Sequence, residues 1–227
     1  MLRRPVAVCL ILAGSLGSVG AITYLFTDPF ANVYSLRDGE TSIDGKWQCA
    51  WTGYGSVGTE LADGDLALKL RPAAALRASE THSSLVVSKS SFGDFVLELE
   101  ARTVEQLRVR QKGPKNGSGP NTWEAAWMLW RVVDTGNFYY FILKTNGVEF
   151  GKLVGSAQYI LATAGAPKLR LGTWDRWTVR AVGPRFTISV NGSAALDVTD
   201  SSFSSGAIGL YCEDAYVQFD NVAVMAP

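Results

Sequence analysis

The sequence predicts an all-β fold, a two-sheet antiparallel β-sandwich that follows an N-terminal signal or anchor segment. Two observations carry this prediction. From Trp47 onward, short apolar runs rich in β-branched and aromatic residues are separated by Gly, Asn, Asp and Pro, which is the pattern of antiparallel strands and their turns. In addition, no long run repeats its apolar residues with the period of an amphipathic helix.

The N-terminal segment has the composition of an export signal. Arg3 and Arg4 precede an uncharged stretch, and the small residues at 19–21 suit cleavage after Ala21. The stretch Val6–Phe26 would also span a bilayer if it were not cut. Both interpretations place the folded part outside the cytoplasm, extracellular or at the cell surface, with membrane contact only through an uncleaved anchor.

The chain divides into three parts. Residues 1–21 are the predicted signal peptide or signal anchor, residues 22–45 are expected to be a tether, and residues 46–227 are expected to form the β-sandwich domain. A chain of 227 residues without tandem repeats or a change of composition predicts one such domain.

Each apolar run of the sandwich domain ends at a turn-forming cluster, so each is expected to be one strand. In chain order the expected strands are Lys46–Thr52, Asp65–Leu70, Ser84–Lys89, Phe95–Thr103, Trp123–Val133, Phe138–Thr145, Val148–Val154, Arg176–Ala181, Phe186–Val190, Ala207–Tyr211 and Val217–Val224. Strands in this number without helices predict two stacked sheets.

The dipeptide Asn146-Gly147 is the strongest hairpin signal in the chain, because a type I′ turn needs positive φ at both central positions. This turn predicts that Thr145 faces Val148, Lys144 faces Glu149, Leu143 faces Phe150 and Ile142 faces Gly151. Leu143 and Phe150 then point to the core, whereas Lys144, Glu149 and Tyr140 share the other face.

Charge and composition exclude two classes of protein. Lys and Arg number 21, as do Asp and Glu, so no basic excess favours nucleic acid, and we expect no nucleic-acid partner. The chain is 47% hydrophobic and 11% aromatic, which excludes an intrinsically disordered protein.

Cleavage of the export segment would leave two cysteines, Cys49 and Cys212, in an oxidising compartment. We expect a disulfide between them, with two buried free thiols as the alternative. Neither cysteine has a CxxC partner, which disfavours zinc.

Paired carboxylates are the candidates for catalysis, because glycosidases usually use two. Glu98 and Glu100 alternate on one expected strand and project to one face, and Glu149 is a third candidate acid or base. The alternative for the first two is a solvated polar face of the sheet.

Aromatic residues are the candidates for sugar binding, because flat rings with a polar N–H suit the C–H faces and hydroxyls of sugars. A sandwich buries one face of each sheet, so some of these rings should lie outside, although any single Trp is also a candidate for the core. The candidate carbohydrate-binding residues are Trp123, Trp127, Trp130, Arg131, Tyr140, Lys144, Asn146, Glu149 and Lys152. For Lys144 and Glu149 the alternative is a cross-strand ion pair.

Four stretches resemble the concanavalin A-like lectin/glucanase superfamily, and within it the laminin-G-like and 3-keto-disaccharide-hydrolase-like branch. They are Trp123–Arg131, Asn137–Lys152, Gly206–Tyr211 and Val217–Val224. The resemblance covers roughly residues 45–225. It implies a bent jelly roll whose concave face holds carbohydrate.

The resemblance also bears on catalysis and metal binding. Family glucanases carry a strand of the type Glu-x-Asp-x-x-Glu, but here Glu98 and Glu100 are followed by Thr103 at the third position, which removes the proton donor. Some relatives bind a structural calcium through an aspartate of the final strand, where Asp220 stands in this sequence; the alternative is an Asp that caps a strand.

The first functional hypothesis is an extracellular, lectin-like carbohydrate-binding module that recognises a polysaccharide or glycan on a concave aromatic-rich face. The second is a polysaccharide-degrading glycoside hydrolase or lyase, and the third is a surface structural or adhesion domain that binds protein. The sequence favours binding over catalysis, because the aromatic residues are dense and the carboxylate pattern is incomplete.

Overall fold

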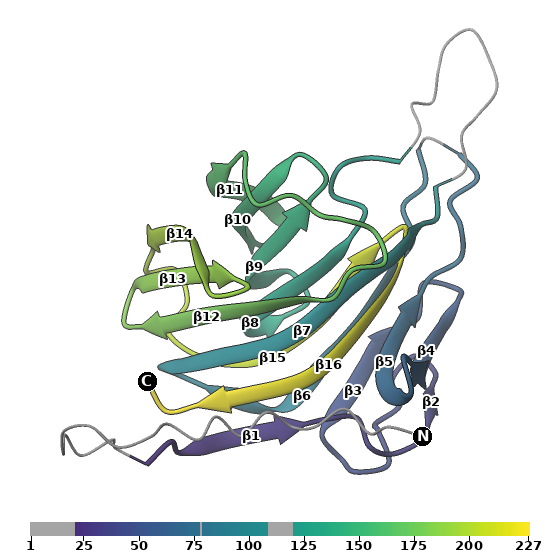
Figure 1. Cartoon of the computed structure of the whole chain (residues 1–227), viewed down its shortest axis with the longest axis horizontal. Helices are drawn as coiled ribbons and strands as arrows, with labels where there is room; N and C mark the ends of the chain where they lie inside the picture. Colours follow the sequence, from purple (N-terminus) through teal and green to yellow (C-terminus); the bar gives the residue numbers. More distant parts are fainter. Residues whose placement is uncertain (1–20, 78, 109–119) are drawn as a thin grey trace, which may run out of the picture.

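The computed structural model describes residues 21–77, 79–108 and 120–227, and within these ranges every regular element is a strand. The strands form two antiparallel sheets packed face to face (Figure 1). The predicted all-β sandwich is therefore confirmed. Residues 1–20 of the predicted export segment, 1–21, lie outside the described residues, and within the described ranges no helix is long and apolar enough to cross a membrane.

One sheet has nine strands. Its order is β14 (Ser193–Thr199), β13 (Arg185–Val190), β12 (Asp175–Val182), β7 (Phe95–Gln106), β16 (Ala215–Met225), β5 (Asp65–Arg71), β4 (Ser56–Ala62) and β2 (Ser35–Leu36), with β1 (Tyr24–Asp28) paired to β16.

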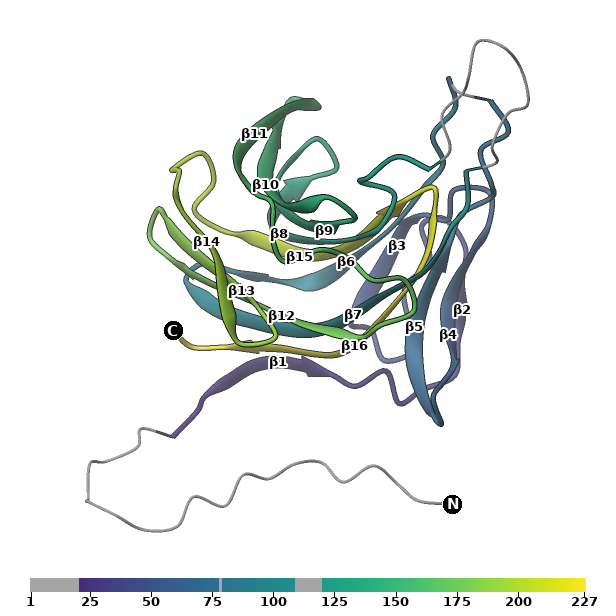
Figure 2. The ribbon, with the colours of Figure 1, turned by 45° about the horizontal axis from the view of Figure 1, so that its top comes forward.

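The other sheet has seven strands. Its order is β11 (Ala157–Ala164), β10 (Gly147–Val154), β9 (Asn137–Lys144), β8 (Ala126–Asp134), β15 (Gly206–Glu213), β6 (Ser83–Phe92) and β3 (Trp47–Trp51). Figure 2 shows that β10 and β11 curl upward, away from the nine-stranded sheet. The outer face of the seven-stranded sheet is thereby concave.

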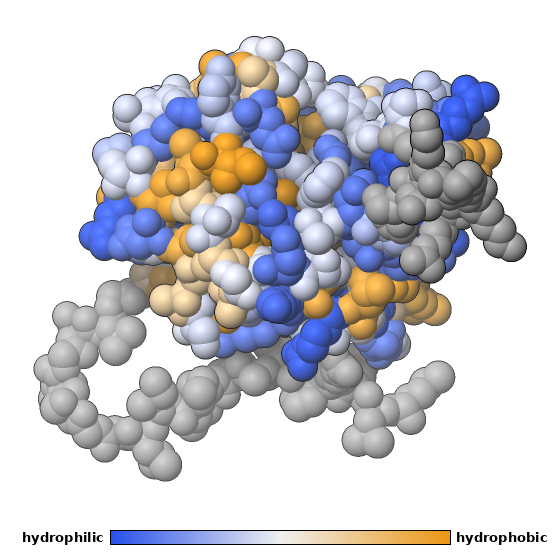
Figure 3. Space-filling model, turned by 90° about the horizontal axis from the view of Figure 1, so that it is seen from above, coloured by the Kyte–Doolittle hydropathy of each residue, from blue (hydrophilic) through white to orange (hydrophobic). Residues whose placement is uncertain are grey.

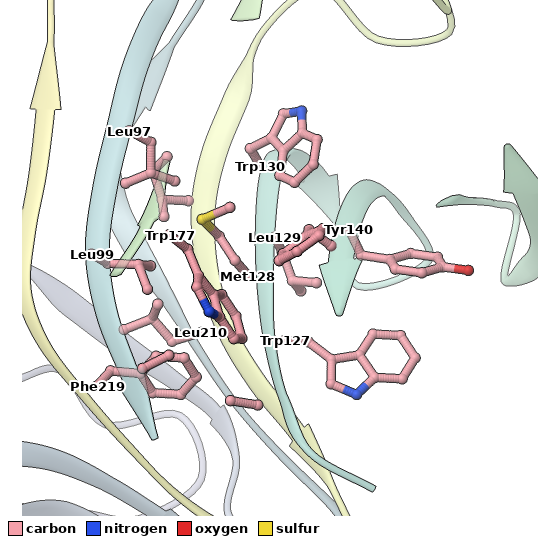
Figure 4. Close-up of a cluster of buried hydrophobic side chains, with 14 of the residues drawn as sticks. Leu97, Leu99, Trp127, Met128, Leu129, Trp130, Tyr140, Trp177, Leu210 and Phe219 are labelled. Atoms are coloured by element: carbon pink, nitrogen blue, oxygen red, sulfur yellow. The ribbon is translucent and has the colours of Figure 1, made fainter. Parts of the chain in front are cut away.

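The core lies between the two sheets and is made of alternating side chains from both. Leu97 and Leu99 of β7 face Met128 and Leu210 of the other sheet, and all four are almost fully buried (Figure 4). Trp130 stacks on Phe150 with ring centroids 5.3 Å apart, and rings in this geometry add to the free energy gained from burial.

The hairpin between β9 and β10 forms one residue earlier than predicted. Lys144 pairs with Gly147, so Thr145 and Asn146 are the turn residues, and Phe150 lies opposite Phe141 instead of Leu143. The glycine serves close packing: a Cβ on Gly147 would lie 2.1 Å from the carbonyl oxygen of Ala164. The predicted faces nevertheless hold, since Tyr140, Lys144 and Glu149 point to the same side.

Residues 22–45, expected as a tether, form strands β1 and β2 and belong to the nine-stranded sheet. The reason is local packing. The ring of Phe30 is buried against Trp47, and the carboxylate of Asp28 accepts a hydrogen bond of 2.7 Å from the indole nitrogen of that tryptophan.

The predicted disulfide is not formed, because β6 lies between the strands that carry the two cysteines. Cys49 is opposite Val86 and Cys212 is opposite Ser84, so two strand spacings, about 10 Å, and an offset of two residues along the strands separate the cysteines. A disulfide bridges Cα atoms no more than about 7 Å apart. Both thiols are free and buried, as the alternative expected.

Candidate functional site

One row of residues crosses the concave face of the seven-stranded sheet. Each member is the direct register partner of the next, and direct partners share a face. The row, from β10 to β3, is Glu149, Ile142, Trp127, Tyr211, Leu85 and Trp51. Figure 4 shows the ring of Trp127 pointing away from the core, together with that of Tyr140.

At the β10 and β9 end of the row, the polar side chains of β9, β10 and the adjacent β11 hydrogen-bond one another. We call this end the closed half. Glu149 accepts a bond of 2.9 Å from the Tyr140 hydroxyl and one of 2.5 Å from Lys144 Nζ. Gln158 of β11 donates to the same hydroxyl at 2.7 Å. Burial, with a contribution from the charge of Glu149, raises the pKa of Tyr140, so its hydroxyl stays protonated.

We call the half of the row on β8 to β3 the open half, although two of its four members, Trp127 and Leu85, are buried. Trp51 and Tyr211 are partly exposed, and Trp123, just before β8, is 43% exposed. The rings of Trp127 and Tyr211 meet edge to face at 5.2 Å, and the Trp127 indole nitrogen donates to the carbonyl oxygen of Trp123. We call these three tryptophans and Tyr211, together with Glu213, the aromatic corner.

Glu213 is the acid of the aromatic corner. It follows Tyr211 by two positions on β15 and therefore points to the same face; its Oε1 accepts a hydrogen bond of 2.7 Å from the Tyr211 hydroxyl. Among the described residues its carboxylate has no other hydrogen-bond partner. Burial raises the pKa of Glu213, and the nearby charges of Asp214 and Glu124 raise it further.

A buried charge cluster lies next to Glu213. Arg108 contacts Glu124 and Asp214 at 2.6 Å each, and both carboxylates are fully buried. The second carboxylate oxygen of Glu124 is buried without a partner within the described residues. Two buried anions face one cation here, and their charges add to the effect of burial, the main cause of the raised pKa of Glu213.

Comparison with known proteins identifies the family. The family model described as "3-keto-alpha-glucoside-1,2-lyase-like domain" matches residues 35–225. The chain belongs to this family. The lyase-like domain therefore lies in the 3-keto-disaccharide-hydrolase-like branch that the sequence resembled. No curated protein matches it.

Solved structures agree on the fold. A carbohydrate-binding module, CBM66 from Bacillus subtilis, is 20% identical with a TM-score of 0.59, covering 80% of this chain and 96% of its own. An endo-β-galactosidase from Clostridium perfringens is 10% identical with a TM-score of 0.57, covering 95% and 65% respectively. The Bacillus licheniformis β-glucanase is 11% identical with a TM-score of 0.52, covering 92% and 99%. The concanavalin A-like jelly roll is thus confirmed for the lyase-like domain.

Four of the predicted sugar-binding residues come together on the concave face of the lyase-like domain. They are Trp127, Tyr140, Lys144 and Glu149. Lys144 and Glu149 form the ion pair that was the alternative for them. Trp123 lies exposed in the segment just before β8, and Asn146 is exposed in the β9–β10 turn.

Trp130, Arg131 and Lys152 do not lie on this concave face. Trp130 is fully buried between the sheets. Arg131 has a φ of 48° at an irregularity of the β8 ladder, and its side chain donates to the carbonyl oxygens of Gly93, Gly183 and Phe203. Lys152 pairs with Asp200 at 2.6 Å. All three side chains are therefore bonded or packed within the fold, away from the concave face on which they were expected.

Glu98 and Glu100 project from β7 on the outer face of the nine-stranded sheet. Their neighbours Leu97 and Leu99 fill the core, so both sheets separate these glutamates from Glu149. Glu100 is held by Arg176 and Asn221 at 3.2 Å each. The three candidate carboxylates therefore do not form one catalytic site.

Asp220 is the register partner of Glu100 on the same outer face. Burial, together with the charge of Glu100, raises the pKa of Asp220 to about 7. In the part of the chain that the structure describes, no group of three or more His, Cys, Asp or Glu residues could hold a metal ion. The calcium site at Asp220 stays a prediction.

Sequence reasoning missed Trp51, Tyr211 and Glu213 as site residues. The predicted strand ended at Tyr211, whereas β15 continues to Glu213, and alternation along this longer strand puts the side chains of Tyr211 and Glu213 on one face. What the sequence did not reveal is that β15 lies between β8 and β6, because strands distant in the chain pair there.

Proposed function

We propose that this domain binds a polysaccharide or glycan at the aromatic corner, outside the cytoplasm. The observation that carries the proposal is the row across the concave face. Its partly exposed members Trp51 and Tyr211 lie beside Glu213, whose side chain is also partly exposed. Aromatic rings pack against the C–H faces of a pyranose, and Glu213 and the Tyr211 hydroxyl can hydrogen-bond sugar hydroxyls. The fold shared with a carbohydrate-binding module supports this assignment.

The open half is the better binding surface because the polar side chains of the closed half already hydrogen-bond one another. Glu149 is neutralised by Lys144, and the Tyr140 hydroxyl has partners on two sides. A sugar on that half would have to break these bonds, which costs free energy because the groups are already desolvated. A sugar bound at Glu213 would instead donate hydrogen bonds to a carboxylate that, among the described residues, accepts one side-chain hydrogen bond.

The second candidate is a lyase, which the family description and Glu213 favour together. In a 3-keto glucoside the ketone acidifies the hydrogen on C2. The carboxylate of Glu213 would take that proton, the C–H electron pair would form the C1–C2 double bond, and the C1–O bond would break. The leaving oxygen would keep its electron pair and take a proton from the solvent. A raised pKa suits a general base near neutral pH.

A protein-binding adhesion domain fits the aromatic corner less well, since its partly exposed rings surround an acid instead of forming a flat apolar patch. Export also remains a proposal, supported by Arg3, Arg4 and the apolar stretch that follows them. Its test is the N-terminal sequence of the protein recovered from the cell exterior: a mature chain that begins at Ile22 supports cleavage, whereas intracellular full-length protein contradicts export.

The deciding experiment combines a glycan array with an assay for product release on the same samples. Trp51→Ala should abolish glycan retention, whereas Glu100→Gln, on the opposite face, should leave it unchanged. Glu213→Gln separates the two candidates: a binding module keeps most of its retention, and a lyase loses turnover of 3-keto disaccharides. Retention that survives Trp51→Ala together with Tyr211→Ala would refute the aromatic corner as the binding site.

A further inference from the structure

The edges of the two sheets differ in how they are protected from pairing with another chain. β2 has only two residues, and β3 is covered by residues 39–42, which bond to its backbone through Gly39 and Ser42 at 2.8 Å each. β14 carries Asp197, paired with Arg185. Short, covered or charged edges do not add further strands readily.

β11 is the long edge without such protection. Its eight residues, Ala157–Ala164, contain no charge, and among the described residues their backbone groups bond only to β10. Tyr159 is 51% exposed and Ile160 is 60% exposed. These two side chains lie on opposite faces of the strand, so each face of this edge carries an exposed apolar side chain.

The surface around β11 is also apolar beyond these two residues. Val154 at the end of β10 is 40% exposed, and Leu161 is partly exposed. Figure 3 shows apolar side chains gathered on the left part of the surface, the side on which β10 and β11 lie in Figure 1. β14 lies near β11 but forms no ladder with it.

We propose that β11 pairs with β11 of a second copy of this chain, which joins the two seven-stranded sheets into one. An identical partner fits because an uncharged strand meets an uncharged strand, so no like charges come together. The nearest charges are already neutralised within each copy, Lys152 by Asp200 and Glu149 by Lys144. A partner with a charged edge would gain no complementary charge here.

The register of this pairing follows from an irregularity in β11. Phe150 pairs with Ala162 and Gly151 pairs with Ile160, so Leu161 is an extra residue that bends the strand. The regular part is residues 157–160. Direct partners in an antiparallel pair share a face, so a two-fold arrangement centres on one residue of this part, either Gln158 or Tyr159, which then lies opposite its own copy in the partner.

Sedimentation velocity of the full chain tests the proposal. A non-ionic detergent should be present throughout, to keep the apolar N-terminal segment from self-associating. At about 100 µM, where small interfaces assemble, the chain should sediment as a dimer, and at about 1 µM as a monomer. Ile160→Lys and Tyr159→Lys should each shift the dissociation constant at least tenfold upward. Val133→Lys, at a side chain 62% exposed but outside β11, is the matched control.

Hydrogen exchange gives a readout that does not depend on the variants. Because the outward amides of β11 are unpaired in the single chain, their exchange should slow as protein concentration rises. Amides of β14, the other long edge, should show no such change. A monomer at about 100 µM, or a dimer that Ile160→Lys and Tyr159→Lys leave intact, would overturn the proposal.

Discussion

The ring of Tyr140 lies directly over Gly151, its register partner on β10. A Cβ on Gly151 would lie 2.2 Å from the Tyr140 hydroxyl oxygen and 2.3 Å from the ring carbon that bears it. The glycine thus makes room for the phenol that bonds Glu149 and Gln158. The closed half of the concave face depends on this missing side chain.

Gly151→Ala should therefore destabilise the fold, by about 1–3 kcal/mol, because Tyr140 must leave its position. Urea denaturation followed by intrinsic fluorescence measures the change. Gly165→Ala is the control, since a Cβ there meets nothing within 4 Å. Equal stability of the two variants would contradict the close approach of Tyr140.

The ion pair of Lys144 and Glu149 should contribute to stability more than a surface pair does. Its side chains are only 13% and 7% exposed, so Glu149→Leu leaves a largely buried ammonium group without its partner, at a cost of about 3 kcal/mol. Asp197→Asn breaks the exposed pair with Arg185 and should leave the urea midpoint unchanged. An unchanged urea midpoint in Glu149→Leu as well would contradict the prediction and show that Lys144 finds another partner.

The sequence predicted the sandwich and the shared face of Tyr140, Lys144 and Glu149, because strand alternation is a local property. It predicted Trp123 and Trp127 of the aromatic corner but not Trp51, Tyr211 and Glu213, whose position beside them depends on β15 lying between β8 and β6. Trp130 and Arg131 were misjudged for a related reason: the irregularity in β8 turns Arg131 inward, and no residue in the sequence marks it. The disulfide was misjudged because its two strands are not neighbours in the sheet.

Stability should fall as pH rises between about 4 and 7, through Asp220. Burial raises the folded pKa of Asp220 to about 7, whereas an unfolded Asp titrates near about 3.9. In this window the folded state binds the proton and the unfolded state does not, so the stabilisation is complete below the unfolded pKa and is lost as pH passes the folded one. Asp220→Asn should flatten the profile and raise the melting temperature at about pH 8. An unchanged slope would show that another group is responsible.

The Lys152–Asp200 pair should have the opposite effect to that of Asp220: it should make the folded state less stable as pH falls into the acid range. Burial alone would raise the pKa of Asp200, but hydrogen bonds from Lys152, Tyr139 and Ser202 outweigh it and hold the pKa well below its usual range. Its contribution is therefore present above the unfolded value of about 3.9 and is lost as pH falls further. Asp200→Asn should make the melting temperature less sensitive to pH below about 4. A steeper acid limb in this variant would contradict the assignment.

The two sandwich cysteines should stay unreactive in the native protein. Burial raises the pKa of Cys49 to about 12 and raises that of Cys212 as well, so neither forms the thiolate that reacts with alkylating agents. Iodoacetamide followed by peptide mass mapping, which also separates Cys9, should find both thiols unmodified in buffer and both alkylated in denaturant without reductant. Because β6 separates the two residues and no disulfide joins them, denaturation alone should make both thiols accessible to iodoacetamide. Alkylation that requires a reductant would instead demonstrate a disulfide and contradict the observed order of β3, β6 and β15.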